Sequence, residues 1–333
     1  MSVLSIANPT LLDLARRMDP DGKIADIVEI LNQVNEVLLD MTWIEGNLPT
    51  GNRSTIRSGL PTPTWRKMYG GVQPNKSTTV QVTDNCGMLE AYAEVDKALA
   101  DLNGNTAEWR LSEEKPQIEG MNETMASTIF YGNEGTLPES FTGLSPRFNS
   151  IANANSGKNI INAGGTGSVN ASIWLCVWAP QTGCGIVPKG SVAGLQMQDK
   201  GQVTIENIDG NFGRMEAYRT HYRWDAGLTV RDWRYFVRIA NIDRSQLTPD
   251  YSTGANLPNL MFQAMDLIPS LSMGRAVFYM DRTLITKVRQ QTSQALKYSA
   301  LTEDQVGGIR LTAFQGVPIR RTDALGVNEA AIS

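Results

Sequence analysis

The sequence predicts an α+β fold in which helices and strands are interleaved without regular βαβ alternation. Apolar residues recur at helical spacing near the N-terminus, whereas a long stretch rich in Gly, Pro, Ser and Thr follows from Gly46 to Thr83. After about residue 170 the chain consists mostly of continuous or alternating apolar runs, which are typical of strands, with helical segments between them. This order of elements does not favour a doubly wound nucleotide-binding sheet.

An amphipathic helix is expected over residues 22–44. The turn Asp19-Pro20-Asp21-Gly22 brings capping acids to its start, and apolar residues from Ile24 to Leu38 then follow helical spacing. The opposite face is acidic and includes Glu29 and Glu36. The helix is therefore predicted to expose a negative surface.

An open β-hairpin is expected from residue 46 to residue 86, because β-branched stretches flank the segment from Pro61 to Gly71. From Gly46 to Thr83 there is no Asp or Glu, and the cations are Arg53, Arg57, Arg66, Lys67 and Lys76. An arm with little core of its own has to bury apolar residues such as Trp65 on another surface.

Two helical stretches, Met88 to Leu99 and Ser112 to Tyr131, are expected after the hairpin. The region that they span holds more acids than bases, and the second helix includes Glu113, Glu114 and Glu119. A basic arm and acidic helices in one chain favour contact between two copies of that chain. The alternatives are that the arm binds nucleic acid through its cations and aromatic residues, or that it folds back on its own subunit.

The rest of the chain is expected to be mainly β. The predicted strands are Ile173–Trp178, Arg214–Asp225, Leu228–Ile242, Ala276–Met280, Ile309–Phe314 and Val317–Arg320, with helices at Leu257–Ile268 and from Asp281 to Gln291. Ala226-Gly227 is the expected break between the second and third of these strands, and residues 152–170 are expected to form a flexible loop.

Composition and motifs disfavour catalysis. The 333 residues have a formal net charge of -4 at pH 7 and a single His, so most metal sites and Ser/His or Cys/His machinery would need His221. Its alternating position predicts an interstrand hydrogen bond instead. The segment from Gly70 to Ser77 has Asn75 in place of the second glycine of a P-loop, and no helix is expected after it. We therefore expect no catalytic site, no cofactor, no metal and no membrane segment.

Segments spread over nearly the whole chain match a known pattern. They are Asn8 to Leu14, Glu45 to Gly51, Leu60 to Lys67, Gln81 to Asp84, Tyr131-Gly132-Asn133, Pro138, Phe141 to Leu144, Tyr222 to Tyr235, Ala276 to Thr283 and Phe314 to Asp323. Together they resemble the major coat proteins of tailed bacteriophages with the Hong Kong 97-like fold, and in particular those of short-tailed phages of the epsilon15 and Bordetella phage type.

The resemblance implies an α+β fold with an N-terminal arm, an extended hairpin loop, a spine helix and mixed α/β lobes. It places the arm and first helix at residues 1–45 and the extended loop at 46–86. The spine helix and peripheral domain would occupy 87–150 and return at about 215–250, and the axial domain would occupy 151–214 and 251–333.

The resemblance also implies a function: hexamers and pentamers that assemble in the bacterial host cytoplasm into the icosahedral shell of a virion, around double-stranded DNA whose sequence is not recognised. A tail or decoration subunit is the alternative. Only about 20 residues precede the first expected helix, so a separate scaffolding protein is expected, with a portal and a decoration protein as further partners.

Contacts between subunits are expected to be non-covalent, although some relatives crosslink a loop lysine and Lys67 and Lys76 are available. The expected contact residues on the extended loop are Arg53, Arg57, Trp65, Arg66, Lys67 and Lys76. Those expected on the acidic helices are Glu29, Glu36, Glu113, Glu114 and Glu119.

Overall fold

The computed structural model describes residues 35–102, 106–153, 155–206, 213–250, 252–295, 301–306, 309–326 and 328–333. The described residues form two compact units. Unit 1 holds 88–126 and 192–225, and unit 2 holds 35–87, 127–191 and 226–333. Three elements contribute residues to both units: β3 (Thr78–Asp96), α4 (Thr106–Tyr131) and β8 (Arg214–Val230). None of the helices in the described residues combines the length and the apolar character that a membrane crossing requires.

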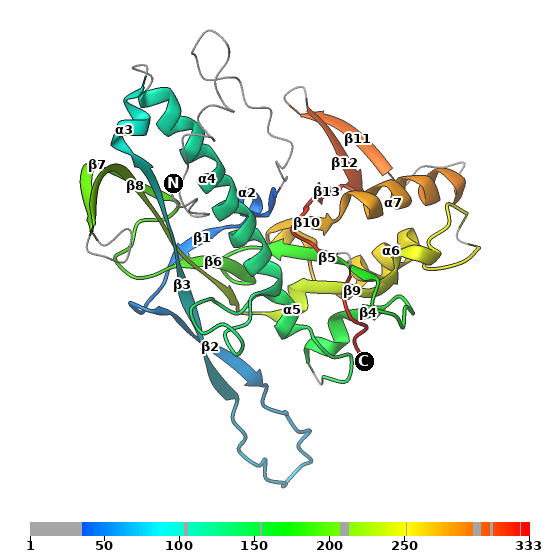
Figure 1. The fold of residues 1–333 in the computed structure, drawn as a ribbon. Helices are drawn as coiled ribbons and strands as arrows, with labels where there is room; N and C mark the ends of the chain where they lie inside the picture. Colours follow the sequence, from blue (N-terminus) through cyan, green and yellow to red (C-terminus); the bar gives the residue numbers. More distant parts are fainter. Residues whose placement is uncertain are drawn as a thin grey trace. The chain divides into compact units, whose positions relative to one another are not determined.

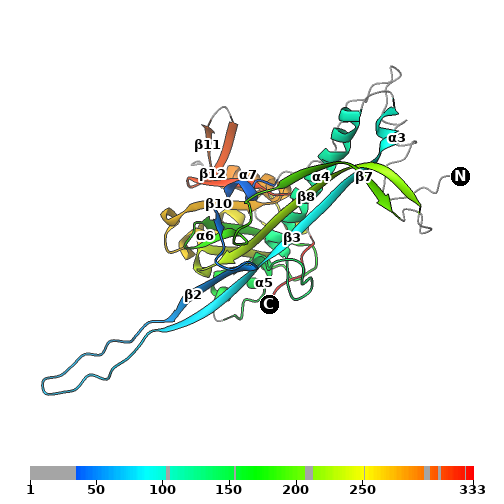
Figure 2. The ribbon, with the colours of Figure 1, turned by 90° about the vertical axis from the view of Figure 1, so that its left-hand side faces the viewer.

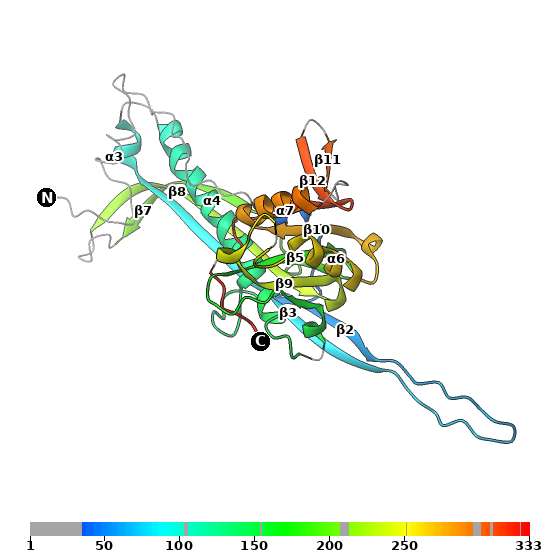
Figure 3. The same ribbon diagram turned by 90° about the vertical axis from the view of Figure 1, so that its right-hand side faces the viewer.

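Unit 2 contains a seven-stranded sheet with the order β11-β12-β13-β10-β5-β9-β4 (Figure 1). The strands are β4 (Ile160–Asn162), β5 (Asn170–Trp178), β9 (Phe236–Asp243), β10 (Arg275–Met280), β11 (Leu301–Val306), β12 (Ile309–Phe314) and β13 (Val317–Arg321). Helix α6 (Leu257–Leu267) packs against β9, and α7 (Arg282–Ala295) packs against β13 (Figure 3). The short helix α5 (Leu144–Arg147) precedes this sheet in the chain.

The second sheet has the order β1-β6-β8-β3-β2, and β7 also pairs with β8. Its other strands are β1 (Trp43–Glu45), β2 (Gly51–Gly59), β6 (Gly183–Val187) and β7 (Gln196–Glu206). Strands β1, β2 and β6 belong to unit 2, and β7 belongs to unit 1.

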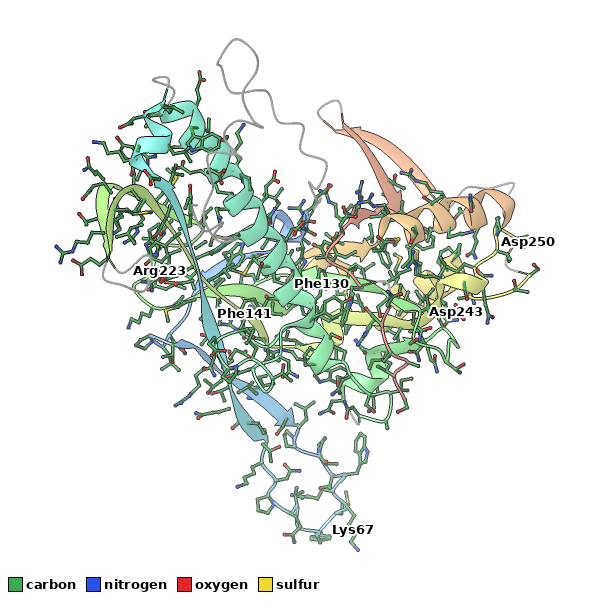
Figure 4. All side chains as sticks on the ribbon, viewed as in Figure 1. Lys67, Phe130, Phe141, Arg223, Asp243 and Asp250 are labelled. Carbon is green, nitrogen blue, oxygen red and sulfur yellow. The ribbon has the colours of Figure 1, made fainter. Side chains whose placement is uncertain are left out.

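The core of unit 2 is aromatic. Strand β5 is buried along its whole length, as expected for a continuous apolar run in the middle of a covered sheet. The Trp174 ring lies 6.4 Å from that of Phe130 and 5.7 Å from that of Phe148, in tilted and edge-on arrangements. Figure 4 marks Phe130 and Phe141, both of which are buried.

Unit 1 has its own small core between α4 and the strands β3 and β8. Ala93, Met121 and Tyr222 form one buried cluster, and Val95 and Trp109 belong to another. Arg110 of α4 lies 2.8 Å from Asp199 of β7, and its hydrogen bond holds the pKa of Asp199 below its usual range.

The opposite side of these strands carries alternating charges. His221 Nε2 lies 3.3 Å from Glu90 Oε2, and the His221 ring stacks on Tyr92 with centroids 4.5 Å apart. Arg219 and Arg223 flank the histidine on β8, and Figure 4 labels Arg223. Arg219 binds Glu94 at 2.6 Å, and Arg223 lies 3.7 Å from Glu90. The predicted interstrand role of His221 is therefore confirmed.

Several predicted elements are confirmed. The extended hairpin is formed by β2 and β3, and the predicted spine helix is α4, which begins at Thr106 rather than at Ser112. The expected strands at β5, β10, β12 and β13 and the expected helices α6 and α7 are present. Asp281 starts α7 as predicted, because its carboxylate accepts a hydrogen bond from the Thr283 amide at 3.0 Å.

One helix prediction was wrong, and a second was wrong at its C-terminal end. Residues Met88 to Asp96 belong to β3, and only Lys97–Ala100 form a helix, α3, where the Asp96 carboxylate accepts from the Ala98 amide. Ala93 and Val95 are buried while Tyr92 is exposed, so the side chains follow the period of a strand. Of the expected helix over 22–44, residues 22–34 lie outside the described residues, and the rest is one turn, α2 (Val37–Asp40), followed by β1.

Three β predictions also needed correction. Ala226-Gly227 is not a break, since β8 runs from Arg214 to Val230. A Cβ atom on Gly227 would lie 2.8 Å from the Asn85 carbonyl, so this glycine permits close strand approach. The next strand begins only at Phe236, after a 3-10 turn at Trp233–Tyr235. The expected loop over 152–170 contains β4, and β6, β7 and β11 were not predicted.

The buried cysteines lead to a labelling prediction. Burial raises the pKa of Cys184 to about 11 and that of Cys176 well above its ordinary value, whereas Cys86 is half-buried. The thiolate is the reactive form, so at pH 8 a thiol reagent should modify Cys86 well before Cys184. Labelling of Cys184 should rise only as the pH approaches 11. The unfolded protein, in which all three thiols react, gives the reference signal. Equal labelling rates for Cys86 and Cys184 at pH 8 in the folded protein would contradict this prediction.

Candidate intersubunit surface

The extended hairpin stands out as the candidate assembly surface of unit 2. Strands β2 and β3 pair antiparallel from Gly51↔Asn85 to Gly59↔Thr78, with an irregularity between Arg57 and Gly59. Residues 60–77 between them, called here the hairpin tip, have no regular structure except a turn. The tip projects away from the two sheets of unit 2 (Figures 2 and 3).

The hairpin tip exposes large apolar side chains. Trp65 and Tyr69 are fully exposed, and Met68 is 88% exposed. Tyr69 has a φ of 60°, a backbone conformation that costs energy for an aromatic residue, and the Gly70 amide donates to the Lys67 carbonyl to close the turn. Clustered apolar side chains on a surface mark a site of protein contact. Lys67 lies at the far end of this tip (Figure 4).

The cations of the extended loop have no carboxylate partners within the part of the chain that the structure describes. Arg53 donates from Nε to the Thr83 hydroxyl at 3.2 Å, and the Asn47 side chain holds the Arg53 backbone. The side chains of Arg57, Arg66, Lys67 and Lys76 are exposed. The structure thus brings the predicted loop residues together on one projecting element.

A cleft of about 1050 Å³ lies at the foot of the hairpin. It is lined by Arg53 and Arg57 from β2 and by Arg231 and Arg234 from the turn after β8. Its one acid, Asp232, binds Arg234 at 2.7 Å, and this hydrogen bond raises the pKa of Arg234. The cleft is therefore cationic. The sequence analysis missed Arg231 and Arg234, because only the fold brings this turn beside β2.

Two of the predicted acidic residues have partners inside their own subunit. Glu36, in unit 2, binds Arg320 at 2.5 Å. Glu114, on α4, accepts from the Thr220 hydroxyl at 2.7 Å and lies 3.6 Å from Arg110.

Glu113 and Glu119 are half-buried on α4, and Glu29 lies outside the described residues. Glu36 and Glu114 thus have arginine partners inside their own subunit, which the sequence analysis did not foresee.

The chain is similar to known phage capsid proteins. The family model of the major capsid protein GP7 matches residues 19–333. A chain of the bacteriophage epsilon15 structure is 38% identical, with a TM-score of 0.78, over 100% of this chain and 99% of that chain. The bacteriophage JBD30 capsid is 13% identical, with a TM-score of 0.46, over 90% of this chain and 93% of that chain. The Microbacterium phage Oxtober96 match is 12% identical, with a TM-score of 0.44, over 69% and 98%. A search of the curated proteins gives no match.

The epsilon15 match covers nearly the whole of both chains, and 38% identity is more than a similar fold alone requires. The family model covers nearly all of this sequence. The interleaved α+β arrangement is accordingly the Hong Kong 97-like capsid fold. The chain belongs to the major capsid protein GP7 family.

Proposed function

We propose that this structural subunit builds the icosahedral shell of a tailed phage by docking its extended loop, without a covalent bond, on a neighbouring copy. The observation that carries the proposal is the hairpin tip, which exposes Trp65, Met68 and Tyr69 beside cations and contains no acid. A tip with these side chains is unfavourable in water and favourable against another protein surface.

Magnitudes indicate which part of the tip drives docking. Burial of a large apolar side chain contributes roughly 1.5–3 kcal/mol, so the three exposed side chains together outweigh the ion pairs. An exposed ion pair contributes about 0.2–1 kcal/mol. We therefore assign affinity to Trp65, Met68 and Tyr69, and we assign orientation and encounter rate to the cations.

The acceptor on the neighbouring copy is proposed to be acidic. The candidates are Glu29, Glu36, Glu113, Glu114 and Glu119. Contact through Glu36 or Glu114 would place a loop cation beside an arginine that already binds the carboxylate. Such a contact gains less than one with an acid that has no arginine beside it.

The division into domains remains part of the proposal. We propose the arm and first helix at 1–45, the extended loop at 46–86, the peripheral domain at 87–150 and about 215–250, and the axial domain at 151–214 and 251–333. Arrangement of copies in hexamers and pentamers, a separate scaffolding protein, a portal, a decoration protein and enclosed double-stranded DNA are proposed from the family.

The test compares changes in the extended loop with changes elsewhere in unit 2. Trp65→Ser with Tyr69→Ser should abolish most shell formation, and Arg57→Glu with Lys67→Glu should slow it, mainly at low salt. Both double variants should unfold at the wild-type urea concentration, because these side chains are exposed. Particle yield is measured by sedimentation and electron microscopy.

Matched controls are Val169→Ser, an exposed apolar residue outside the loop, and Lys158→Glu, an exposed cation outside the loop. Both should assemble normally. Wild-type yields from the Trp65 and Tyr69 double variant would overturn the proposed role of the tip.

A further inference from the structure

The segment before the extended loop, Asn35–Glu45, joins the seven-stranded sheet to strand β6 of the second sheet, within unit 2, and is called here the strap. At its start, Asn35 forms an antiparallel bridge with Thr322, and its side chain accepts from the Ala324 amide at 3.1 Å. Val37 and Met41 are buried. The first part of the strap is thereby attached beside β13, in the seven-stranded sheet.

Asp40 is the charged centre of this attachment. Its side chain is 1% exposed and lies 2.5 Å from Arg275 of β10 and 3.4 Å from Arg320 of β13. The Tyr279 hydroxyl donates to Asp40 at 3.1 Å and accepts from Trp178 Nε1 at 2.9 Å. A carboxylate removed from water in this way is stable only with its cations and donors in place, so the strap is fixed to strands β10 and β13.

The other end of the strap belongs to the second sheet. Strand β1 pairs in parallel with β6, from Trp43↔Gly185 to Glu45↔Val187. A Cβ atom on Gly185 would lie 2.5 Å from the Trp43 ring, so glycine lets this indole rest on the β6 backbone. The Gly46 amide then donates to the Val187 carbonyl at 2.8 Å.

The chain enters the extended loop directly from this point. The backbones of Leu48 and Gly51 bond to each other, and the Asn47 side chain binds the amide and carbonyl of Arg53. From Asp40 to β2, each successive part of the chain is therefore held by hydrogen bonds or strand pairing. The position of Asp40 thus determines where β2 begins.

The two sheets of unit 2 are also joined at the short turn between β5 and β6, where Ala179 and Gly183 form a bridge. They are joined again where β8 leads through Trp233–Tyr235 into β9, and the strap adds a buried ion cluster to these connections. We propose that Asp40 is a positioning residue that fixes the direction of the extended loop relative to the seven-stranded sheet. Its importance for the shell rests on the proposed function, but the positioning itself can be measured on unassembled subunits.

The experiment measures one distance by pulsed electron paramagnetic resonance. Spin labels are placed at Thr55→Cys on β2 and Gln263→Cys on α6, both exposed positions of unit 2, in the full chain with Cys86→Ser. The parent protein should give one narrow distance. Asp40→Asn keeps the size of the side chain but removes its charge, and it should abolish the single narrow distance in favour of a broad distribution.

The matched control is Arg282→Gln, which removes one of the two arginine partners of Asp323 beside the start of the strap and leaves the partners of Asp40 in place. It should keep the narrow distance.

Tyr279→Phe removes one donor to Asp40 and should broaden the distance distribution less than Asp40→Asn. If Asp40→Asn fails to fold, the distribution measured on Tyr279→Phe tests the positioning role instead.

If the folded Asp40 and Tyr279 variants keep the parent distance distribution, the positioning role is overturned, whether or not these variants form shells. Failure of the Trp65 and Tyr69 variants to affect shells would instead overturn the proposed function and leave this distance unaffected.

Discussion

Replacement of Arg238 by methionine is expected to lower the free energy of unfolding by about 3–5 kcal/mol, because it leaves a buried carboxylate without its cation. Arg238 is 3% exposed and binds Glu329 at 2.9 Å. The Glu329 carboxylate also accepts from the hydroxyls of Tyr131 and Ser172. Burial, together with the neighbouring Glu329, raises the pKa of Tyr131 well above its ordinary value.

Arg238 has further contacts that methionine cannot replace. It donates to the Phe148 carbonyl at 2.8 Å, and its guanidinium lies 5.2 Å from the centre of the Trp174 ring. Urea unfolding followed by tryptophan fluorescence measures the loss. Arg234→Met, which breaks the exposed pair with Asp232, should cost at most about 1 kcal/mol.

A second replacement separates the loss of the cation from the loss of packing. Arg238→Met with Glu329→Met removes both charges, and it should recover part of the stability lost in Arg238→Met alone. If the double variant were less stable than the single one, the unpaired carboxylate would not be the cause of the loss.

Phe130→Ala is expected to cost about 3–5 kcal/mol, since it opens a cavity in the aromatic core of unit 2. Phe130 is fully buried, with its ring 6.4 Å from that of Trp174 and 6.0 Å from that of Tyr279. The same urea experiment applies, and Phe130→Leu should lose less because it fills more of the space. Leu137→Ala, at a position that is 56% exposed, should change stability by less than about 0.5 kcal/mol.

The sequence predicted those elements whose signal is local. The absence of acids from Gly46 to Thr83 marked the extended loop, the unbroken apolar run of β5 marked a buried strand, and Asp281 marked the start of α7. Each of these signals depends on residues that are close in the chain. The loop cations were also predicted correctly as a group, because they lie close together in the sequence.

Features that depend on distant partners were missed. Residues 88–96 are rich in helix-forming Leu, Ala and Glu, but pairing with β8, far along the chain, makes them a strand. Gly227 was predicted to lie in a turn, but in the structure its lack of a side chain lets the Asn85 backbone lie close to it within the sheet. In the same way, Arg320 of β13 binds Glu36 and the Thr220 hydroxyl of β8 donates to Glu114. Charge counting could not find these contacts, and it assigned both carboxylates wholly to a neighbouring copy.

The irregular backbone of the hairpin tip has a consequence for the entropy of assembly. Pro61, Pro63 and Pro74 lie in this segment, and each fixes one backbone dihedral before any contact forms. A loop of glycine and serine would lose far more freedom when a neighbour captured it. In the proposed docking, the prolines would reduce that loss at each equivalent contact of the shell, so a modest saving per subunit would be multiplied across the whole particle.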